Sequence, residues 1–369
     1  MDFSFSEEQE TVGKVARQLF EHRATPERLT VLESGEHRFD ADLWSELASA
    51  DLLGIALPEA VGGTEGSFLE LGVLLSEVGR SVAPVPLYST LVLGADTIAR
   101  HGDSTLQEKY LRGVVDGSTI LSAGLSEPGN SDPTSPRAQA RRDGDAWRLD
   151  GTKQLVPAAQ LANAVVVSAR ADDGPALFVV DTDADGVDVQ SVQTTNHEPH
   201  ADVVLTGARA QRLGADIGAE SVRSLYTRAL VGLCAVQVGV TERALRIAAS
   251  YTSEREQFGR PIGSFQAVQQ RMADAFIDVE AIRWTTWHAA WLIAEGRPAD
   301  RAAAIAKFWA AEAGARVTAT AQQVHGGMGI DVTYPVSRYF LWAKQIELAL
   351  GSAPQQLLRL GSAYAEGNQ

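Results

Sequence analysis

Two stretches in the last third of the chain decide how it is interpreted: Arg255-Glu256-Gln257-Phe258-Gly259, followed by Gln266, and Gln323-Val324-His325-Gly326-Gly327. In the first stretch, a guanidinium can donate in a fork to phosphate oxygens, and a phenyl ring offers a flat surface to another ring. In the second, glycines at a helix end let a phosphate or an adenosine approach the backbone. Each stretch alone is also compatible with an ordinary loop, with Arg255 as a surface charge and His325 as a structural histidine.

Length and composition describe a large, acidic, globular protein. The chain has 369 residues, of which 45% are hydrophobic and 21% charged, and its formal net charge is −15 with a pI near 4.9. This length is enough for two or three domains. A strongly acidic surface repels the phosphates of nucleic acid and of anionic membranes, so neither is expected as a partner.

Cysteine content and local hydropathy narrow the class further. Cys234, the single cysteine, lies in the apolar stretch Leu230–Val236 and is expected to be a small buried residue. One thiol builds neither a disulfide framework nor a cysteine metal site, and no metal is expected. Residues 1–8 lack the pattern of a secretory signal, and no uninterrupted apolar run reaches the roughly 18–20 residues of a membrane helix. A soluble, cytoplasmic protein is therefore expected.

Periodicity changes twice along the chain. Residues 1–118 show helical spacing, and residues 119–213 hold short β-rich runs separated by glycine and proline, with a turn expected at Asp150-Gly151. Residues 214–369 are helical again, with an interruption expected over Tyr251–Gly263 and helices expected at about 265–295 and 299–324. The sequence therefore predicts helices, then a small sheet or barrel, then a helix bundle.

Taken together, the two opening stretches resemble the acyl-CoA dehydrogenase family. The family motif Arg-x-x-Phe-Gly-x-x-Ile-x-x-x-Gln is matched at Arg255, Phe258, Gly259, Ile262 and Gln266. The second stretch is similar to Gln-x-x-Gly-Gly-x-Gly, and Tyr334-Pro335-Val336 follows at the family's usual place. Residues 53–63 also look like the family, so the resemblance covers nearly the whole chain.

The resemblance implies a mainly α fold with a β middle domain: an N-terminal helical domain (1–118), a β-barrel (119–213) and a C-terminal four-helix bundle (214–369). It implies FAD held between two subunits, with both stretches reaching across the interface to the neighbour's FAD. It also implies α,β-dehydrogenation of an acyl-CoA thioester, with electrons usually passed to an electron-transfer flavoprotein. The residues that the resemblance assigns to FAD are Arg255, Gln257, Phe258, Gln266, Gln323, Val324, His325, Gly326 and Gly327.

The general base that this chemistry needs is missing. Relatives carry a glutamate sixteen residues after the tyrosine of Tyr-Pro-Val, which here is Leu350, or on the first bundle helix, which here is Ala229. Neither side chain can accept the α-proton. Glu347, one helical turn before Leu350, is better explained as an ordinary helix charge than as a replacement base.

The segments that surround the flavin ring in relatives are altered as well. Ser126–Asp132 is one residue shorter than the family's Thr-Glu-Pro-x-x-Gly-Ser-Asp, and Leu155-Val156-Pro157-Ala158 replaces Trp-Ile-Thr-Asn. A stacking ring, a hydroxyl and a backbone N–H are thereby lost, and Leu230 replaces a basic residue that touches CoA in relatives. What the chain would supply to its own flavin and substrate is degraded, whereas what it would supply to a neighbour's FAD is intact.

This asymmetry resembles the glutamate-lacking subunit of heterotetrameric acyl-CoA dehydrogenases that act on steroid side-chain CoA esters. The main prediction is a non-catalytic partner in an α2β2 complex whose second subunit carries the catalytic glutamate. The alternatives are a self-sufficient homo-oligomeric flavoenzyme with an unusual base or non-dehydrogenase chemistry, and a flavin-free structural homologue. An ordinary homotetrameric dehydrogenase ranks lower because of Leu350 and Ala229.

Overall fold

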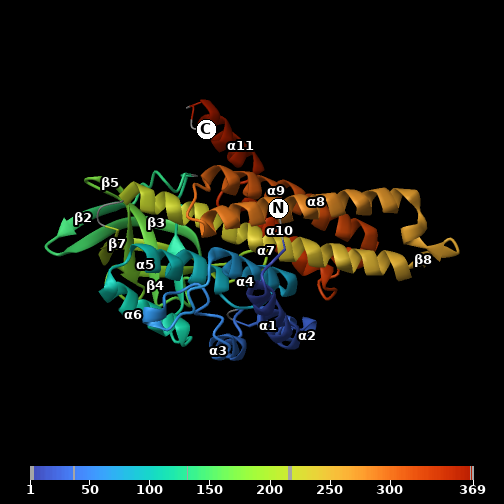
Figure 1. The fold of residues 1–369 in the computed structure, drawn as a ribbon, viewed down its shortest axis with the longest axis horizontal. Helices are drawn as coiled ribbons and strands as arrows, with labels where there is room; N and C mark the ends of the chain where they lie inside the picture. Colours follow the sequence, from blue (N-terminus) through green and yellow to red (C-terminus); the bar gives the residue numbers. More distant parts are fainter. Residues whose placement is uncertain (1–3, 36–37, 131, 215–217, 366, 368–369) are drawn as a thin grey trace. The chain divides into compact units, whose positions relative to one another are not determined.

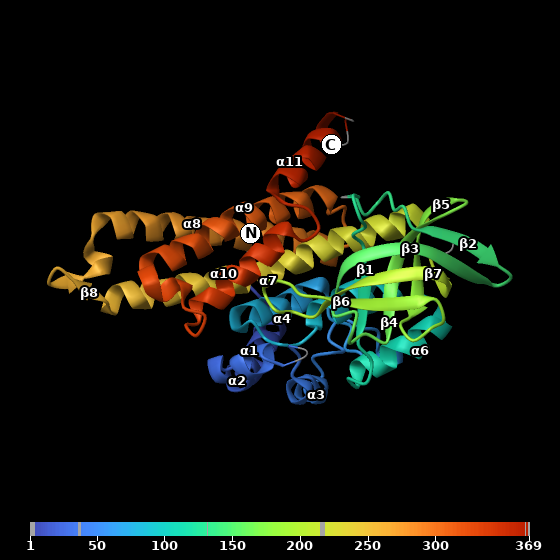
Figure 2. The ribbon, with the colours of Figure 1, turned by 180° about the vertical axis from the view of Figure 1, so that it is seen from behind.

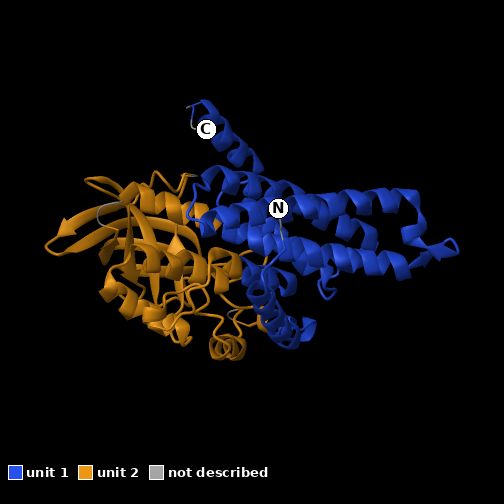
Figure 3. Cartoon of the chain, viewed as in Figure 1, with its two compact units in different colours: residues 1–31, 72–83, 230–369 blue, residues 32–71, 84–229 orange. Residues whose placement is uncertain are grey.

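The structure is a computed structural model that describes residues 4–35, 38–130, 132–214, 218–365 and 367 (Figure 1). The chain forms two compact units, each assembled from separate segments (Figure 3). Unit 1 comprises residues 1–31, 72–83 and 230–369, and unit 2 comprises residues 32–71 and 84–229. The predicted class, mainly helical with a strand-rich middle segment, is confirmed. The division of the chain at residues 118 and 213 stays a prediction.

In chain order, one group of helices precedes the strands of the barrel and another follows them. They are α1 (Glu7–Arg23), α2 (Pro26–Glu33), α3 (Ala41–Ser49), α4 (Phe68–Ser81), α5 (Asp96–His101), α6 (Ser104–Val115), α7 (Gly218–Glu254), α8 (Gln266–Ala294), α9 (Asp300–His325), α10 (Val336–Leu348) and α11 (Ala353–Ala365). Short helical turns are η1 (Glu59–Val61), η3 (Ile262–Ser264) and η4 (Gly326–Ile330), and η2 (Tyr88–Ala95) is a π-helix. The first helix is capped by Ser6, whose Oγ accepts from Gln9 N at 3.2 Å.

The strands of unit 2 close into the predicted barrel. They are β1 (Leu121–Gly124), β2 (Gln139–Asp143), β3 (Ala146–Pro157), β4 (Ala164–Ala171), β5 (Gly174–Asp181), β6 (Val187–Val192) and β7 (His200–Leu213). The pairing runs β4-β2-β3-β7-β5, and β5 pairs back to β4, which completes a closed ring (Figure 2). β1 and β6 attach to β4 and β7. Closure leaves the ring strands without a free edge.

The turn predicted at Asp150-Gly151 is wrong. Both residues lie inside β3, at a register shift against β7. The Asp150 carboxylate accepts from Gly207 N at 2.9 Å and so stabilises a bulge instead of a turn. Gly151 is needed there because its φ is 142° and a Cβ would lie 2.8 Å from the Ala138 Cβ. The chain turns earlier, at Gly144, between β2 and β3.

Unit 1 is built on α7, which continues into it from unit 2. By length and hydropathy α7 could cross a membrane, but 94% of its most apolar window is buried, as in a core helix. α7 crosses α4 at backbone contact: a Cβ on Gly239 would lie 1.8 Å from Ser76 O, and one on Gly79 would lie 1.9 Å from Val236 O. Only glycine permits so close a crossing. α8 and α10 pack on α9, which completes the helical core.

Candidate functional site

The Arg255–Gly259 stretch forms a hairpin that protrudes where α7 and α8 meet (Figure 1). α7 runs through Glu254, so the chain breaks after Glu254 and not at Tyr251 as predicted. Strand β8 (Glu256–Gln257) then pairs with β9 (Arg260–Pro261), and the N–H of Ile262 donates to Arg255 O at 2.8 Å. This pairing gives the stretch a defined hairpin conformation.

The tip of the hairpin presents its functional groups to solvent. Phe258 is 93% exposed and adopts a φ of 55°, an uncommon conformation for a bulky residue. The side chains of Arg255, Gln257 and Gln266 are also exposed. Within the described residues, no ion pair or hydrogen bond holds the Arg255 guanidinium. A Cβ on Gly259 would meet no heavy atom within 4 Å, so the backbone there is open to a ligand.

The second stretch ends α9 and begins η4. Gln323 is exposed and Val324 half-buried, and both Gly326 and Gly327 have open space where a Cβ would lie. Gly326 has φ 59° and ψ −133°, a combination that favours glycine. The turn closes where Gln322 Nε2 donates to Gly329 O at 3.2 Å. The backbone of this glycine turn therefore has a defined conformation and is accessible to a ligand.

The side chain of His325, in contrast, faces inward. It is 3% exposed, its Nδ1 lies 2.6 Å from Ala321 O, and its ring stacks on Tyr251 at 4.2 Å between centroids. The imidazole therefore has the structural role that the sequence left open as an alternative. Tyr251 joins the two stretches, and sequence reasoning did not single it out; its place one turn before Arg255 was the available signal.

The exposed groups of these two stretches fit FAD. A free guanidinium and open glycine N–H groups suit a diphosphate, and an exposed phenyl ring suits a flat heterocycle. Arg255 and the glycines of the second stretch would hold the diphosphate and adenosine, whereas Phe258 would cover a ring. No group of three or more His, Cys, Asp or Glu side chains suited to a metal occurs in the described part of the chain.

Leu350, at the first base position, lies in the connection between α10 and α11 with a φ of 55°. Its carbonyl accepts from Gln356 Nε2 at 3.2 Å. The Lys307 ammonium donates to Glu347 O at 3.1 Å and to Gly351 O at 3.0 Å. Burial lowers the pKa of Lys307 to about 8. The Glu347 carboxylate pairs with Lys344, which agrees with an ordinary helix charge.

Ala229, at the second base position, is fully buried on α7. Its carbonyl accepts from the Tyr88 hydroxyl of η2 at 3.1 Å. Beside it, Arg228 Nη1 donates to Asp96 Oδ1 at 3.3 Å, and burial lowers the pKa of Arg228 to about 10. The π-helix η2 was missed by sequence reasoning, because its apolar run carries no signal that separates π from α winding.

The shortened Ser126–Asp132 segment is anchored by a buried ion pair; Ser131 lies outside the described residues. Glu127 Oε1 lies 2.6 Å from Lys153 Nζ, which also contacts Ser168 Oγ at 3.0 Å. Burial raises the pKa of Glu127, but the Lys153 ammonium and two backbone N–H donors outweigh burial and lower it. Burial lowers the pKa of Lys153 to about 8. The segment therefore keeps a defined shape.

The Leu155–Ala158 segment offers no aromatic ring to a flavin. Leu155 has a φ of 51° and is 49% exposed, and its N–H donates to Asp202 Oδ1 at 2.9 Å. Pro157 ends β3 opposite His200 and supplies no backbone donor. In this structure the segment therefore presents no aromatic ring, and Pro157 offers no backbone N–H.

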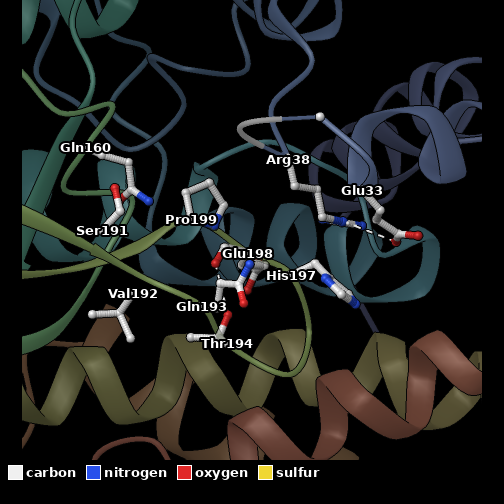
Figure 4. A pocket seen from close by; sticks show the side chains of 11 residues that line it. Glu33, Arg38, Gln160, Ser191, Val192, Gln193, Thr194, His197, Glu198 and Pro199 are labelled. Atoms are coloured by element: carbon white, nitrogen blue, oxygen red, sulfur yellow. Dashed lines mark hydrogen bonds and ion pairs between the residues drawn. The ribbon is translucent and has the colours of Figure 1, made fainter.

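A cavity of about 310 Å³ lies within unit 2, between the end of α2 and the β6–β7 loop (Figure 4). Glu33, Gly35, Arg38, Gln160, Ser191, Val192, Gln193, Thr194, His197, Glu198 and Pro199 line it. Arg38 Nε lies 3.5 Å from Glu33 Oε1, so the cavity wall carries charges of both signs. None of the residues that the family resemblance assigns to FAD lines this cavity.

Family models and known relatives match nearly the full chain. The acyl-CoA dehydrogenase N-terminal, middle and C-terminal domain models match residues 6–118, 122–209 and 218–364. The acyl-CoA dehydrogenase FadE27 of Mycobacterium tuberculosis is 40% identical, with 99% of each chain covered. The chain belongs to the acyl-CoA dehydrogenase family, whose members are oxidoreductases acting on CH–CH bonds and bind FAD.

Two solved complexes are similar in both sequence and fold. A variant of the Tcur3481–Tcur3483 steroid ACAD has a TM-score of 0.94 and 47% identity, covering 98% of this chain and 99% of that one. The ChsE4–ChsE5 complex from Mycobacterium tuberculosis has a TM-score of 0.94 and 41% identity, covering 99% of both. These similarities confirm the predicted resemblance to subunits of heteromeric acyl-CoA dehydrogenases. The role of this chain within such a complex stays a prediction.

Proposed function

We propose that this chain is the non-catalytic partner in an α2β2 acyl-CoA dehydrogenase, where it completes the FAD site of a second subunit that carries the glutamate base. Arg255, Gln257, Phe258, Gln266 and the Gln323–Gly327 backbone hold the diphosphate and adenosine of that FAD. When bound, FAD accepts the hydride taken from the acyl-CoA. The residues of this chain bind and orient it.

One observation carries the proposal: the chain has no proton acceptor at either base position but keeps an accessible hairpin, Arg255–Gly259, whose groups fit FAD. Leu350 and Ala229 are aliphatic, and Glu347 is held by Lys344. Phe258 is nearly fully exposed with a positive φ, although water is an unfavourable environment for a phenyl ring. Folding of the chain alone does not account for this hairpin, whereas contact with a neighbouring subunit does.

The outer face of α8 supports assembly with another chain. Four large apolar side chains on this one helix are 39–63% exposed: Phe276, Ile277, Trp284 and Trp291. Aromatic residues of this kind anchor protein interfaces, and an apolar patch on one helix is costly in water. We refer to these four residues as the α8 outer face.

Domain limits, substrate and further partners are proposed from the family and the similar complexes. We propose domains at 1–118, 119–213 and 214–369, an acyl-CoA substrate bound on the catalytic subunit, and an electron-transfer flavoprotein as acceptor. A steroid side-chain CoA ester is proposed as substrate because one similar solved structure is described as a steroid ACAD. We also propose a cytoplasmic location, and the acidic composition argues against a nucleic-acid or membrane partner.

Purification of the chain alone, and together with a second family member that retains the glutamate, tests the proposal. The complex should contain one FAD per pair of chains and dehydrogenate acyl-CoA, and glutamine in place of the partner's glutamate should abolish turnover. The lone chain should bind FAD poorly and show no activity. Stoichiometric FAD and turnover in the lone chain would overturn the proposal and favour the self-sufficient alternative.

A further inference from the structure

Three aromatic rings meet between the two candidate FAD stretches in unit 1. The Tyr251 ring stacks on the His325 imidazole with centroids 4.2 Å apart and planes inclined by 27°. On the other contact, the Tyr334 ring lies 5.2 Å from the imidazole at 54°. Tyr251 belongs to the last turn of α7, His325 ends α9, and Tyr334 precedes α10. The end of α7, the end of α9 and the segment before α10 therefore meet at one central ring.

Each ring is tied through the backbone to a segment that would touch FAD. The Tyr251 carbonyl accepts from Arg255 N at 2.8 Å, where the hairpin begins. His325 directly precedes Gly326 and Gly327. The N–H of Tyr334 donates to Asp331 O at 3.1 Å, which closes the turn after η4. A displaced ring would therefore displace the hairpin or the glycine turn.

The imidazole contributes mainly as a ring. Because a carbonyl oxygen only accepts, the Nδ1 that lies 2.6 Å from Ala321 O carries hydrogen. Nε2 of His325 is buried and, among the described residues, has no hydrogen-bond partner. A buried polar atom left in this way costs free energy, so the nitrogen does not explain the site. The two ring contacts remain as the feature that does.

We propose that Tyr251, His325 and Tyr334 form an aromatic clamp that holds the hairpin and the glycine turn in one FAD-competent arrangement. His325 is its central positioning residue, and its buried imidazole does not itself contact FAD. The clamp rests on the proposed FAD role of the two stretches. Without it, the two stretches would occupy several relative positions. The apparent affinity for FAD would then fall in proportion to the competent fraction.

The test uses the reconstituted complex with the glutamate-bearing subunit, and FAD affinity is measured by flavin fluorescence titration. His325→Ala removes both ring contacts and should weaken FAD binding about tenfold. His325→Phe keeps a flat ring and should stay within about twofold of the wild-type affinity. Tyr334→Leu removes only the ring contact with His325 and should weaken FAD binding about threefold. This variant replaces His325→Ala in the test if His325→Ala does not fold.

A matched control separates positioning from loss of stability. Val279 lies in a buried cluster with Ala275 and Val317 in the α8–α9 core. Val279→Ala should lower the thermal midpoint but leave FAD affinity unchanged. If this control weakens FAD binding as strongly as His325→Ala does, general destabilisation explains the effect and the clamp is refuted.

Arg255→Ala distinguishes failure of the clamp from failure of the proposed function. If Arg255→Ala leaves FAD binding unchanged, the hairpin does not serve FAD and the proposed function fails with the clamp. If Arg255→Ala weakens binding while His325→Ala does not, only the clamp fails. The clamp is also overturned if His325→Phe binds FAD as poorly as His325→Ala, since a nitrogen and not the ring would then be required.

Discussion

Replacement of Lys307 by methionine should change how the stability of the protein depends on pH. The Lys307 side chain is fully buried, and its Nζ donates to Glu347 O and Gly351 O in the turn that carries Leu350. Burial lowers its pKa from the usual 10.5 to about 8. Methionine keeps a similar length and apolar stem but carries no titrating group.

The sign follows from the two pKa values of Lys307. Because the folded-state pKa is the lower one, the unfolded chain binds more protons between about pH 8 and pH 10.5. The buried ammonium therefore costs free energy below pH 8, and this cost falls as pH rises through the window. At 1.36 kcal/mol per pKa unit, the gap of about 2.5 corresponds to about 3 kcal/mol at pH 7, of which roughly 1.3 kcal/mol is recovered by pH 9.

Urea unfolding at pH 7, 8 and 9 measures this effect for the wild type and for Lys307→Met. The free energy of unfolding of the wild type, minus that of the variant, should rise by roughly 1 kcal/mol from pH 7 to pH 9. Other titrating groups cancel in the difference. Lys14→Met, on the exposed side of α1, is the control and should give a flat difference. A flat difference for Lys307→Met as well would refute the account of a buried, costly ammonium.

Three further predictions concern folding and assembly. Gly239→Ala should destabilise unit 1 by about 3 kcal/mol or more in thermal unfolding, because its Cβ would lie 1.8 Å from Ser76 O. The control is Gly361→Ala on α11, where space is open, and it should be neutral or slightly stabilising. Glu127→Gln should cost about 3–5 kcal/mol because the Lys153 ammonium stays buried without its carboxylate, whereas an unchanged urea midpoint would contradict the ion pair. Trp284→Ala on the α8 outer face should weaken assembly with the second subunit in mass photometry without lowering the thermal midpoint of the lone chain; unaltered assembly would exclude this face as an interface.

The helices of the last third could be predicted because their signals are local. Segments expected at residues 265–295 and 299–324 are α8 (Gln266–Ala294) and α9 (Asp300–His325). Glycine and proline interrupt long apolar periods there, and these breaks need no tertiary contact to be recognised. The cap at Ser6 is likewise set by residues within one turn.

The errors in the barrel have a different origin. Asp150-Gly151 has the composition of a turn, but β3 continues through it because Gly207 and the neighbouring strand satisfy the Asp150 carboxylate. β2 carries Gln139, Arg141 and Arg142 and shows no alternating apolar pattern, so it becomes a strand only by pairing with β3. Long-range pairing overrides local composition in both cases.

The candidate site was predictable as a list of residues but not as a set of roles. The family motifs assign both Phe258 and His325 to FAD. The Phe258 side chain, however, is almost entirely exposed, whereas that of His325 is almost entirely buried. Spacing cannot tell which way a side chain points at a helix end. The inward stack of His325 on Tyr251 depends on how α7 and α9 meet, which is a tertiary property.

The two halves of the site differ in what folding requires of them. At the turn after α10, Lys307 and Gln356 donate to backbone carbonyls, and these hydrogen bonds can form whichever side chain stands at residue 350. At the hairpin, the opposite holds: a positive φ and an exposed phenyl ring at Phe258 both oppose folding of the isolated chain. The glutamate side chain, which the hydrogen bonds of this turn do not require, is absent. The exposed phenyl ring of Phe258, which opposes folding, is present. The proposed heteromeric complex accounts for this contrast, because the hairpin would then contact the FAD of a second subunit that carries the base.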